Sequence, residues 1–297
     1  MTNVSDQGSG TLLDQPALAR LAALVGSRAV SATIVESGQN NRVLDFGDRI
    51  VRLPRHAEAV AALRREAGLL GRIRPALPIA VPDVRIIESE IGTVAVHDRL
   101  PGEAFHSLGG FVGEDRRRLA HDLASFLCSL HGLPAGVVAD GRREDTWQEL
   151  SQRLAADVLP LLSPTARTAV DAAFHGFAAR VGDLPVAVIH GDFGTGNILA
   201  ARRRVTGVID FAGCGLGDPA YDFASLAAGL GDAFLGAMEP LYPGLSAMRD
   251  RIAFYRGTFP LLDILFGLDH GDDDTLADGV AGAERHFAGP APAQRRT

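Results

Sequence analysis

The densest group of polar residues on an apolar background spans residues 188–199 and contains Asp192 and Asn197. Asp210 follows 18 residues after Asp192, directly behind the apolar pair 208–209. Both aspartates therefore leave short predicted strands, and loops on such a scaffold commonly carry reactive groups. Phosphoryl transfer needs one carboxylate that orients an attacking hydroxyl and takes its proton, plus hard oxygen ligands for Mg²⁺. The pattern predicts Asp192 as the catalytic carboxylate, with Asn197 and Asp210 as metal ligands.

Other chemistries fit the same segment less well. Its glycines do not form a dinucleotide-binding fingerprint, because the chain continues as a strand rather than a helix after Asn197. A two-metal phosphoesterase would need more ligands, and only His190 lies close to Asp192 in sequence. We expect His190 to shape the loop by hydrogen bonding, and Asp218 and Asp222 to tie the loop to the start of the next helix.

The composition excludes several functions. The chain has 297 residues, a net charge of -7 and 29 basic residues, all of them arginine. Without lysine there is no Walker-type phosphate loop and no Schiff-base catalysis. The acidic balance argues against nucleic-acid partners. With two cysteines, no export signal and no apolar stretch of membrane-spanning length, we expect a cytoplasmic protein without a membrane partner. We also expect a monomer.

Hydrophobic periodicity predicts the elements that must position these residues. In the first third, a helix is expected over 12–25, strands over 30–36, 42–46 and 50–53, a helix over 56–74, and strands over 84–88 and 93–97. These segments indicate a small antiparallel unit of five strands with one inserted helix. The Pro-Gly pair within 98–103 is typical of a connection between lobes.

Helical patterns dominate after this connection. Helices are expected near 113–131, 146–160 and 163–181, strands over 186–189, 198–200 and 206–209, and helices, including 251–268, as far as 287. The resulting hypothesis is an α+β fold with an N-terminal lobe over 1–98, a larger and mostly helical lobe over 99–287, and a disordered tail over 288–297.

One ordered set of motifs resembles a known family. The chain carries, in order, His190-Gly191-Asp192, Asn197, Ile209-Asp210, Gly217-Asp218-Pro219 and Tyr221-Asp222. This set resembles the signature of the aminoglycoside phosphotransferases, antibiotic kinases that share the protein-kinase fold. The resemblance implies a bilobal kinase-like fold and a nucleotide-binding N-terminal lobe. It also implies ATP or GTP as phosphate donor, together with Mg²⁺.

The resemblance also assigns nucleotide-binding residues. Arg52 stands where a kinase carries its strand lysine, which implies that it grips the nucleotide phosphates. Glu66 lies on the apolar stripe of its predicted helix, and a buried carboxylate needs a partner, so we expect an ion pair with Arg52. The phosphate-covering loop would contain Ser37, Gly38 and Asn40. The interlobe connection with His97 and Arg99 would meet the base.

Acidic residues near the C-terminus indicate the class of acceptor. Asp263, Asp269 and Asp272 are expected to line a cleft that attracts a polycation. Together with the resemblance, they imply phosphate transfer to a hydroxyl of a cationic antibiotic, an aminoglycoside or a viomycin-type or capreomycin-type peptide, and hence resistance. A macrolide phosphotransferase, a metabolic small-molecule kinase and a non-catalytic nucleotide-binding module remain as alternatives.

Overall fold

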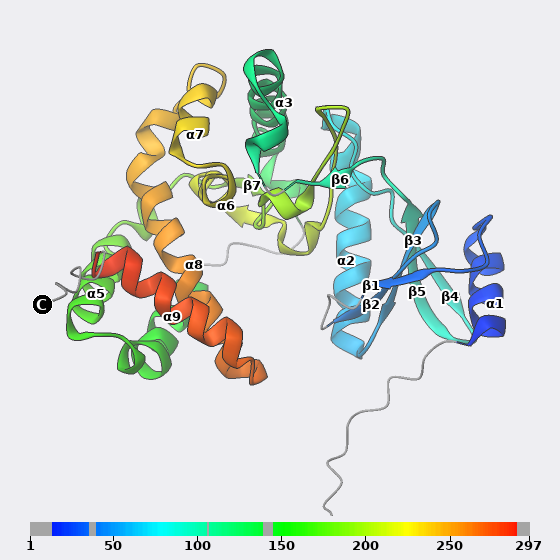
Figure 1. Cartoon of the computed structure of the whole chain (residues 1–297), viewed down its shortest axis with the longest axis horizontal. Coiled ribbons are helices and arrows are strands. Elements are labelled where there is room, and N and C mark those ends of the chain that lie inside the picture. The colour runs from blue at the N-terminus through cyan, green and yellow to red at the C-terminus, as the bar shows by residue number, and fades with distance from the viewer. Residues whose placement is uncertain (1–13, 36–39, 106, 139–144, 290–297) are drawn as a thin grey trace, which may run out of the picture. The chain divides into compact units, whose positions relative to one another are not determined.

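The computed structural model describes residues 14–35, 40–105, 107–138 and 145–289. The chain divides into two compact units (Figure 1). The first comprises Met1–Arg74 and Val81–Leu100, and the second comprises Pro75–Ala80 and Pro101–Thr297. The division thus falls two residues after the predicted boundary at 98, and a short segment before residue 81 groups with the second unit. The part of the predicted tail over 290–297 lies outside the described residues.

The first unit is built on one antiparallel sheet of five strands. Its elements are α1 (Gln15–Val25), β1 (Thr33–Val35), β2 (Asn41–Asp45), β3 (Arg49–Pro54), α2 (Ala57–Ile73), β4 (Arg85–Ser89) and β5 (Gly92–Asp98). The strand order is β1-β2-β3-β5-β4, and every neighbouring pair is antiparallel. The five-stranded unit with one inserted helix is therefore confirmed.

Alternation along β3 separates the two faces of this sheet. Val51 is fully buried and packs with Leu44, Val96 and the apolar residues of α1. Arg52 points to the opposite face, as successive side chains of a strand must, and meets α2 there. One helix thus covers each face of the sheet (Figure 1). This arrangement places the charged face of β3 under α2.

The second unit is mostly helical. Its helices are α3 (Gly113–His131), α4 (Asp145–Arg153), α5 (Pro164–Ala178), α6 (Ala220–Leu230), α7 (Asp232–Met238), α8 (Arg249–His270) and α9 (Asp273–Phe287). Its strands form two small antiparallel sheets, β6-β8-β9 and β7-β10. These strands are β6 (Glu103–Ala104), β7 (Ala187–Ile189), β8 (Ile198–Ala201), β9 (Arg204–Val208) and β10 (Gly215–Gly217). None of the helices within the described ranges has the length and apolarity needed to cross a membrane.

The predicted helix over 146–160 is shorter in the structure. The α-helical hydrogen bonds end at Arg153, a π-helical turn covers Leu154–Val158, and a 3-10 turn follows over Leu159–Leu161. Pro160 has no backbone N–H to donate, so the chain cannot continue as a regular α-helix there. Leu154 and Val158 are buried against α5 and α8 residues in a common core. Packing therefore keeps the irregular segment in place.

Candidate active site

Asp192 and Asn197 lie together in the loop between β7 and β8. Asn197 occupies the last position of a 3-10 turn, and its backbone N–H donates to the carbonyl of Gly194. Its Nδ2 donates to Asp192 Oδ2 over 2.8 Å and to the Asp192 carbonyl over 3.0 Å. The Asp192 side chain is exposed. One carboxylate oxygen is thus held by Asn197, and the other makes no hydrogen bond among the described residues.

His190 shapes this loop from its buried side. The residue is fully buried, and its ring stands 4.6 Å from that of Phe211. The N–H of Asp192 donates to His190 Nδ1 over 3.2 Å, which leaves the proton on Nε2, where it is donated to the Ile209 carbonyl over 3.1 Å. Both ring nitrogens are occupied by backbone groups, so the expected hydrogen-bonding role of His190 is confirmed.

Asp222 anchors the same loop from α6. Its oxygens accept the backbone N–H groups of His190 over 2.8 Å and Gly191 over 2.9 Å. The expected tie between this aspartate and the loop is therefore confirmed. Burial alone would raise the pKa of Asp222, but the hydrogen bond and charge of His131, with the donors of the loop, lower it instead. Asp222 stays ionised because the two backbone N–H groups of the loop and the His131 ring donate hydrogen bonds to its carboxylate.

His131 and Tyr242 complete a buried chain of polar contacts behind Asp222. His131 Nε2 donates to Asp222 Oδ2 over 3.0 Å, and Nδ1 lies 2.8 Å from the Tyr242 hydroxyl. Burial raises the pKa of Tyr242 far above its ordinary value, so its hydroxyl stays protonated. Neither residue was expected from the sequence. The available signal was a histidine four positions after buried Leu127 on the apolar stripe of α3, whereas no local pattern marks Tyr242.

Asp210 lies two residues after β9, next to the loop of residues 190–197, which we name the catalytic loop after the role expected of Asp192. Its backbone has φ +64° and ψ +71°, a left-handed conformation that costs a non-glycine residue about 1–3 kcal/mol. The preceding residue, Ile209, donates its N–H to the Asn197 carbonyl over 2.9 Å. A Cβ on Gly191, which has φ +81°, would collide with the Gly213 carbonyl, so the two loops pack backbone to backbone. The Asp210 side chain is exposed and makes no hydrogen bond among the described residues.

In the first unit, Arg52 and Glu66 form the expected ion pair. Arg52 Nη1 and Nη2 donate to Glu66 Oε2 and Oε1 over 2.9 and 3.0 Å. The side chains are 14% and 4% exposed, so the pair is nearly dry. The Arg52 Nε atom is buried without a hydrogen bond. The geometry explains why a carboxylate occupies the buried face of α2.

The other predicted nucleotide-binding residues have different surroundings. Ser37 and Gly38 lie outside the described residues. Asn40 is exposed, and its Oδ1 lies 3.1 Å from His56 Nε2. His97 is 8% exposed; burial lowers its pKa, and its Nδ1 donates to the Asp98 carbonyl over 2.8 Å. Arg99 donates through Nε to Asp45 Oδ2 over 2.9 Å. Their role toward a nucleotide stays a prediction.

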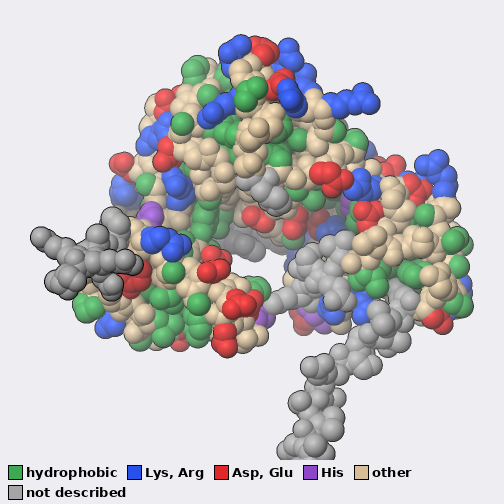
Figure 2. Space-filling model, in the orientation of Figure 1, with side chains coloured by type: hydrophobic (Ala, Val, Ile, Leu, Met, Phe, Trp, Pro, Cys, Tyr) green, Lys and Arg blue, Asp and Glu red, His purple; other side chains and the backbone are tan. Residues whose placement is uncertain are grey.

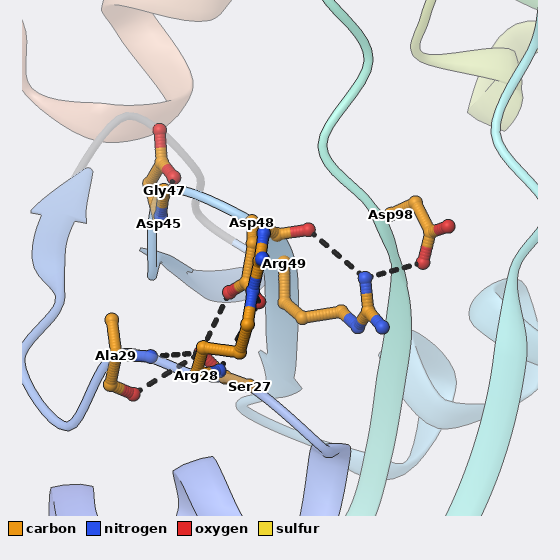
Figure 3. Close-up of polar contacts among 8 residues, drawn as sticks. All are labelled: Ser27, Arg28, Ala29, Asp45, Gly47, Asp48, Arg49 and Asp98. Atoms are coloured by element: carbon orange, nitrogen blue, oxygen red, sulfur yellow. Dashed lines mark hydrogen bonds and ion pairs between the residues drawn. The ribbon is translucent and has the colours of Figure 1, made fainter.

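Polar contacts around the β2–β3 turn fix the end of β5 (Figure 3). Arg49 Nη1 lies 2.7 Å from Asp98 Oδ1 and donates to the Asp48 carbonyl over 3.2 Å. The Asp48 carboxylate accepts from Ser27 Oγ over 2.7 Å and from the Arg28 N–H over 3.1 Å. The turn is thereby tied both to the segment after α1 and to the end of β5, where His97 and Arg99 lie.

The three acids predicted to bind the acceptor differ in whether they already have a partner in the structure. Asp269 forms an ion pair with Arg153 over 2.8 Å, and Asp272 caps α9 by accepting from the N–H and hydroxyl of Thr275. Asp263 has no ion pair among the described residues; partial desolvation and nearby Asp278 raise its pKa. Figure 2 shows acidic side chains gathered around the amino end of α9. Two of the three acids therefore already have structural partners.

A cavity beside the catalytic loop was not expected from the sequence. It has a volume of about 320 Å³ and is lined by residues of α4, β7, β10, α6 and α8 and of the segment before β7. Gly191, which directly precedes Asp192, and Gly213, three residues after Asp210, form part of its wall. Its apolar residues come from distant segments, and each matches an ordinary core pattern locally, so only the tertiary structure brings them together.

Comparisons with known proteins show the family of the chain. The phosphotransferase enzyme family matches residues 31–254. The chain is 27% identical over 288 residues to viomycin phosphotransferase of Streptomyces vinaceus, covering 88% of this chain and 96% of that protein. A GDP complex of aminoglycoside 2′-phosphotransferase-IIIa aligns with a TM-score of 0.77 and 22% identity, covering 87% of this chain and 92% of the other. A macrolide 2′-phosphotransferase from Brachybacterium faecium aligns with a TM-score of 0.69 and 24% identity, covering 94% and 99%.

The structural likenesses confirm the protein-kinase-like α+β fold. The matched range contains the catalytic loop, Asp210, and the Arg52–Glu66 pair. Motif order, local geometry and family match therefore converge, and the chain belongs to the phosphotransferase enzyme family.

Proposed function

We propose that this enzyme transfers the γ-phosphate of a nucleoside triphosphate to a hydroxyl of a cationic antibiotic. The observation that carries the proposal is the Asp192–Asn197 hydrogen bond of 2.8 Å, which orients one carboxylate oxygen and leaves the other exposed. Such a carboxylate can accept the proton of an acceptor hydroxyl and aim its oxygen at the phosphate. Phosphoryl transfer depends mainly on positioning and charge stabilisation, which suits this rigid loop.

Asp192 binds the acceptor hydroxyl through its free oxygen and takes the proton as the oxygen–phosphorus bond forms. His190 and Asp222 hold the backbone of the loop, so Asp192 needs little reorganisation when the acceptor arrives. The acceptor keeps the phosphoryl group as an ester, and the nucleoside diphosphate leaves with the electron pair of the broken bond. Asp192 then returns the proton to solvent.

The residues present fit a magnesium site. Because Asn197 Nδ2 is committed to Asp192, its Oδ1 is free to bind a cation, and the Asp210 carboxylate has no competing donor among the described residues. Mg²⁺ prefers such oxygen ligands and commonly binds through one or two protein groups plus water and substrate phosphates. When bound, it would neutralise the charge that develops on the phosphate oxygens.

Arg52 is the proposed phosphate-binding cation of the first unit. Glu66 fixes the two terminal nitrogens of its guanidinium, and the remaining nitrogen, Nε, is buried without a partner. A braced guanidinium keeps its position at low entropic cost when it meets an anion. Ser37, Gly38, Asn40, His97 and Arg99 complete the proposed binding surface for ATP or GTP. The proposal also includes a monomeric enzyme in the cytoplasm, where the donor nucleotide is made.

An aminoglycoside or a viomycin-type peptide is the proposed acceptor. The net charge of -7 and the acidic residues near α9 favour a cation, and the matched viomycin phosphotransferase acts on a compound of that kind. A macrolide acceptor is the second candidate, because a macrolide phosphotransferase is among the matched structures and the cavity beside Gly191 is largely apolar.

The test is a panel assay with purified protein, Mg²⁺ and either ATP or GTP. Acceptor-dependent release of nucleoside diphosphate would be followed while products are identified by mass spectrometry. The panel contains aminoglycosides, viomycin, capreomycin, macrolides, sugars and amino alcohols. A singly phosphorylated cationic antibiotic supports the proposal, turnover of a sugar or amino alcohol alone replaces it with a metabolic kinase, and nucleotide binding without any turnover indicates a non-catalytic module.

A further inference from the structure

The cavity beside the catalytic loop has the size and lining of a small-molecule site. Its volume of about 320 Å³ is roughly twice that of an engineered apolar cavity of about 150 Å³ that binds benzene. Aromatic walls come from Trp147 and Tyr255, whose rings stand 5.6 Å apart. Leu150, Leu184 and Leu216 add aliphatic surface. The lining therefore favours apolar groups over charged ones.

The charged residue in this lining is already neutralised. Asp218 is 7% exposed, and its Oδ2 accepts from Arg251 Nε over 2.7 Å and from the Tyr255 hydroxyl over 3.2 Å. Its Oδ1 accepts the N–H of Ala220 over 3.0 Å. None of the acids predicted to bind the acceptor lines the cavity. A bare ammonium group entering it would lose water without gaining an unpaired carboxylate, which is unfavourable.

We propose that this cavity is an acceptor subsite for an apolar alkyl or ring group, so that the enzyme prefers, among its cationic acceptors, those that carry such a group. The inference rests on the proposed function, because it assigns the acceptor to this site. The cavity wall includes Gly191, whose neighbour Asp192 must reach the reacting hydroxyl, and Gly213, which follows Asp210 closely. A compound that buries its apolar part here carries its hydroxyl next to the catalytic loop, and its cationic groups stay at the acidic surface.

Tryptophan fluorescence can report whether a ligand occupies the cavity. Trp147 is the single tryptophan of the sequence, and it lines the cavity. Its fluorescence can be titrated with two probes of equal charge and equal hydroxyl content, 2-aminoethanol and 6-aminohexan-1-ol. A buried methylene contributes about 0.8 kcal/mol, which is about fourfold in affinity. We expect the longer probe to bind at least tenfold more tightly and to shift the emission; equal affinities would overturn the subsite.

Two substitutions test the location. Leu184→Asn keeps the approximate shape of the side chain but makes the wall polar, and Val186→Phe fills space at the rim, where Val186 is 39% exposed. The matched control is Leu161→Asn, because Leu161 is 45% exposed and does not line the cavity. We expect the first two variants to bind 6-aminohexan-1-ol about tenfold more weakly than the wild type, and the control to bind it with unchanged affinity. Equal binding in all three would overturn the assignment.

Turnover separates this inference from the proposed function. For any antibiotic that the enzyme phosphorylates, Leu184→Asn is expected to raise KM about tenfold more for an acceptor with an apolar group than for a polyhydroxylated amine. If antibiotics are phosphorylated but neither fluorescence nor KM responds to the variants, the subsite fails and the function stands. If the probes bind as expected but no antibiotic is phosphorylated, the proposed acceptor fails and the apolar site stands.

Discussion

At the scale of single residues, the catalytic loop is a set of mutually fixed groups. Asn197 donates both to the carboxylate and to the carbonyl of Asp192, so one amide fixes the side chain and the backbone of the same residue. His190 fixes the Asp192 N–H from the opposite side. Three contacts therefore define one exposed carboxylate oxygen. Preorganisation of this kind places the cost of ordering in folding rather than in the reaction.

Asp192→Ala is expected to lower kcat by about 10²- to 10⁴-fold, because it removes the proton acceptor and the orienting group. Nucleotide affinity should stay within about twofold, since Asp192 carries no proposed contact to the donor. Asp210→Asn is the matched comparison: it should weaken Mg²⁺-dependent nucleotide binding instead. Steady-state kinetics and equilibrium nucleotide titration check both variants. Wild-type turnover by Asp192→Ala would refute the catalytic assignment.

A second residue-scale expectation concerns pH. The folded-state pKa of Asp222 is lowered, so the folded protein binds fewer protons than the unfolded chain in acid. The stabilisation is therefore complete above the ordinary value of 3.8 and is lost as the pH falls through the lower folded value. Asp222→Asn should lower the free energy of unfolding by about 3 kcal/mol at neutral pH and flatten its acid dependence. Denaturant unfolding across pH checks this, with exposed Asp171→Asn as control.

At the scale of elements, the buried Arg52–Glu66 ion pair joins α2 to the sheet. Glu66→Gln leaves the Arg52 charge in a nearly dry position, so we expect a loss of about 3 kcal/mol in the free energy of unfolding. Glu88→Gln is the control, because the Arg64–Glu88 pair is 57% exposed on both sides and should contribute less than about 1 kcal/mol. Equal losses measured by denaturant unfolding would contradict the distinction.

A double variant of this pair distinguishes its contribution to stability from its contribution to nucleotide binding. A double variant, Arg52→Met with Glu66→Leu, removes both charges and fills similar volume. It should recover most of the stability lost in Glu66→Gln, because a buried ion pair and an apolar pair are often close in energy. It should still bind nucleotide at least tenfold more weakly than the wild type if Arg52 grips phosphate. Wild-type nucleotide affinity in this variant would limit Arg52 to a structural role.

Elements that local sequence patterns specify could be predicted, and elements that depend on tertiary packing could not. The five-stranded sheet and the helix over 113–131 were predictable because periodicity and turn residues are local signals. The Arg52–Glu66 pair was predictable because a carboxylate on an apolar stripe demands a partner. The π-helical turn at Leu154–Val158 was not, since tertiary packing overrides the local pattern. The partners of Asp269 and Asp272 were missed for a related reason, because an acidic run does not reveal which carboxylates are already engaged.

At the scale of the whole molecule, charge and apolarity act on the acceptor over different ranges. The net charge of -7 produces a long-range attraction for cations, which salt screens over about 10 Å at 0.1 M ionic strength. The cavity beside Gly191 acts only in contact, through the loss of apolar surface from water. Ionic strength and wall polarity are therefore two independent controls on the same binding event.

Ionic strength separates the attraction of the acidic surface from the apolar contact in the cavity. For a cationic acceptor, kcat/KM should fall roughly tenfold as salt rises from low to above-physiological concentration, because steering is lost. The double variant Asp273→Asn/Asp274→Asn, at the acidic amino end of α9, should reduce this slope, whereas Glu90→Gln, which changes an exposed acid of the first unit, should not. Leu184→Asn should lower kcat/KM at every salt concentration and leave the slope unchanged. A salt slope that follows Leu184 rather than Asp273 and Asp274 would mean that the cavity, not the acidic surface, receives the cationic groups.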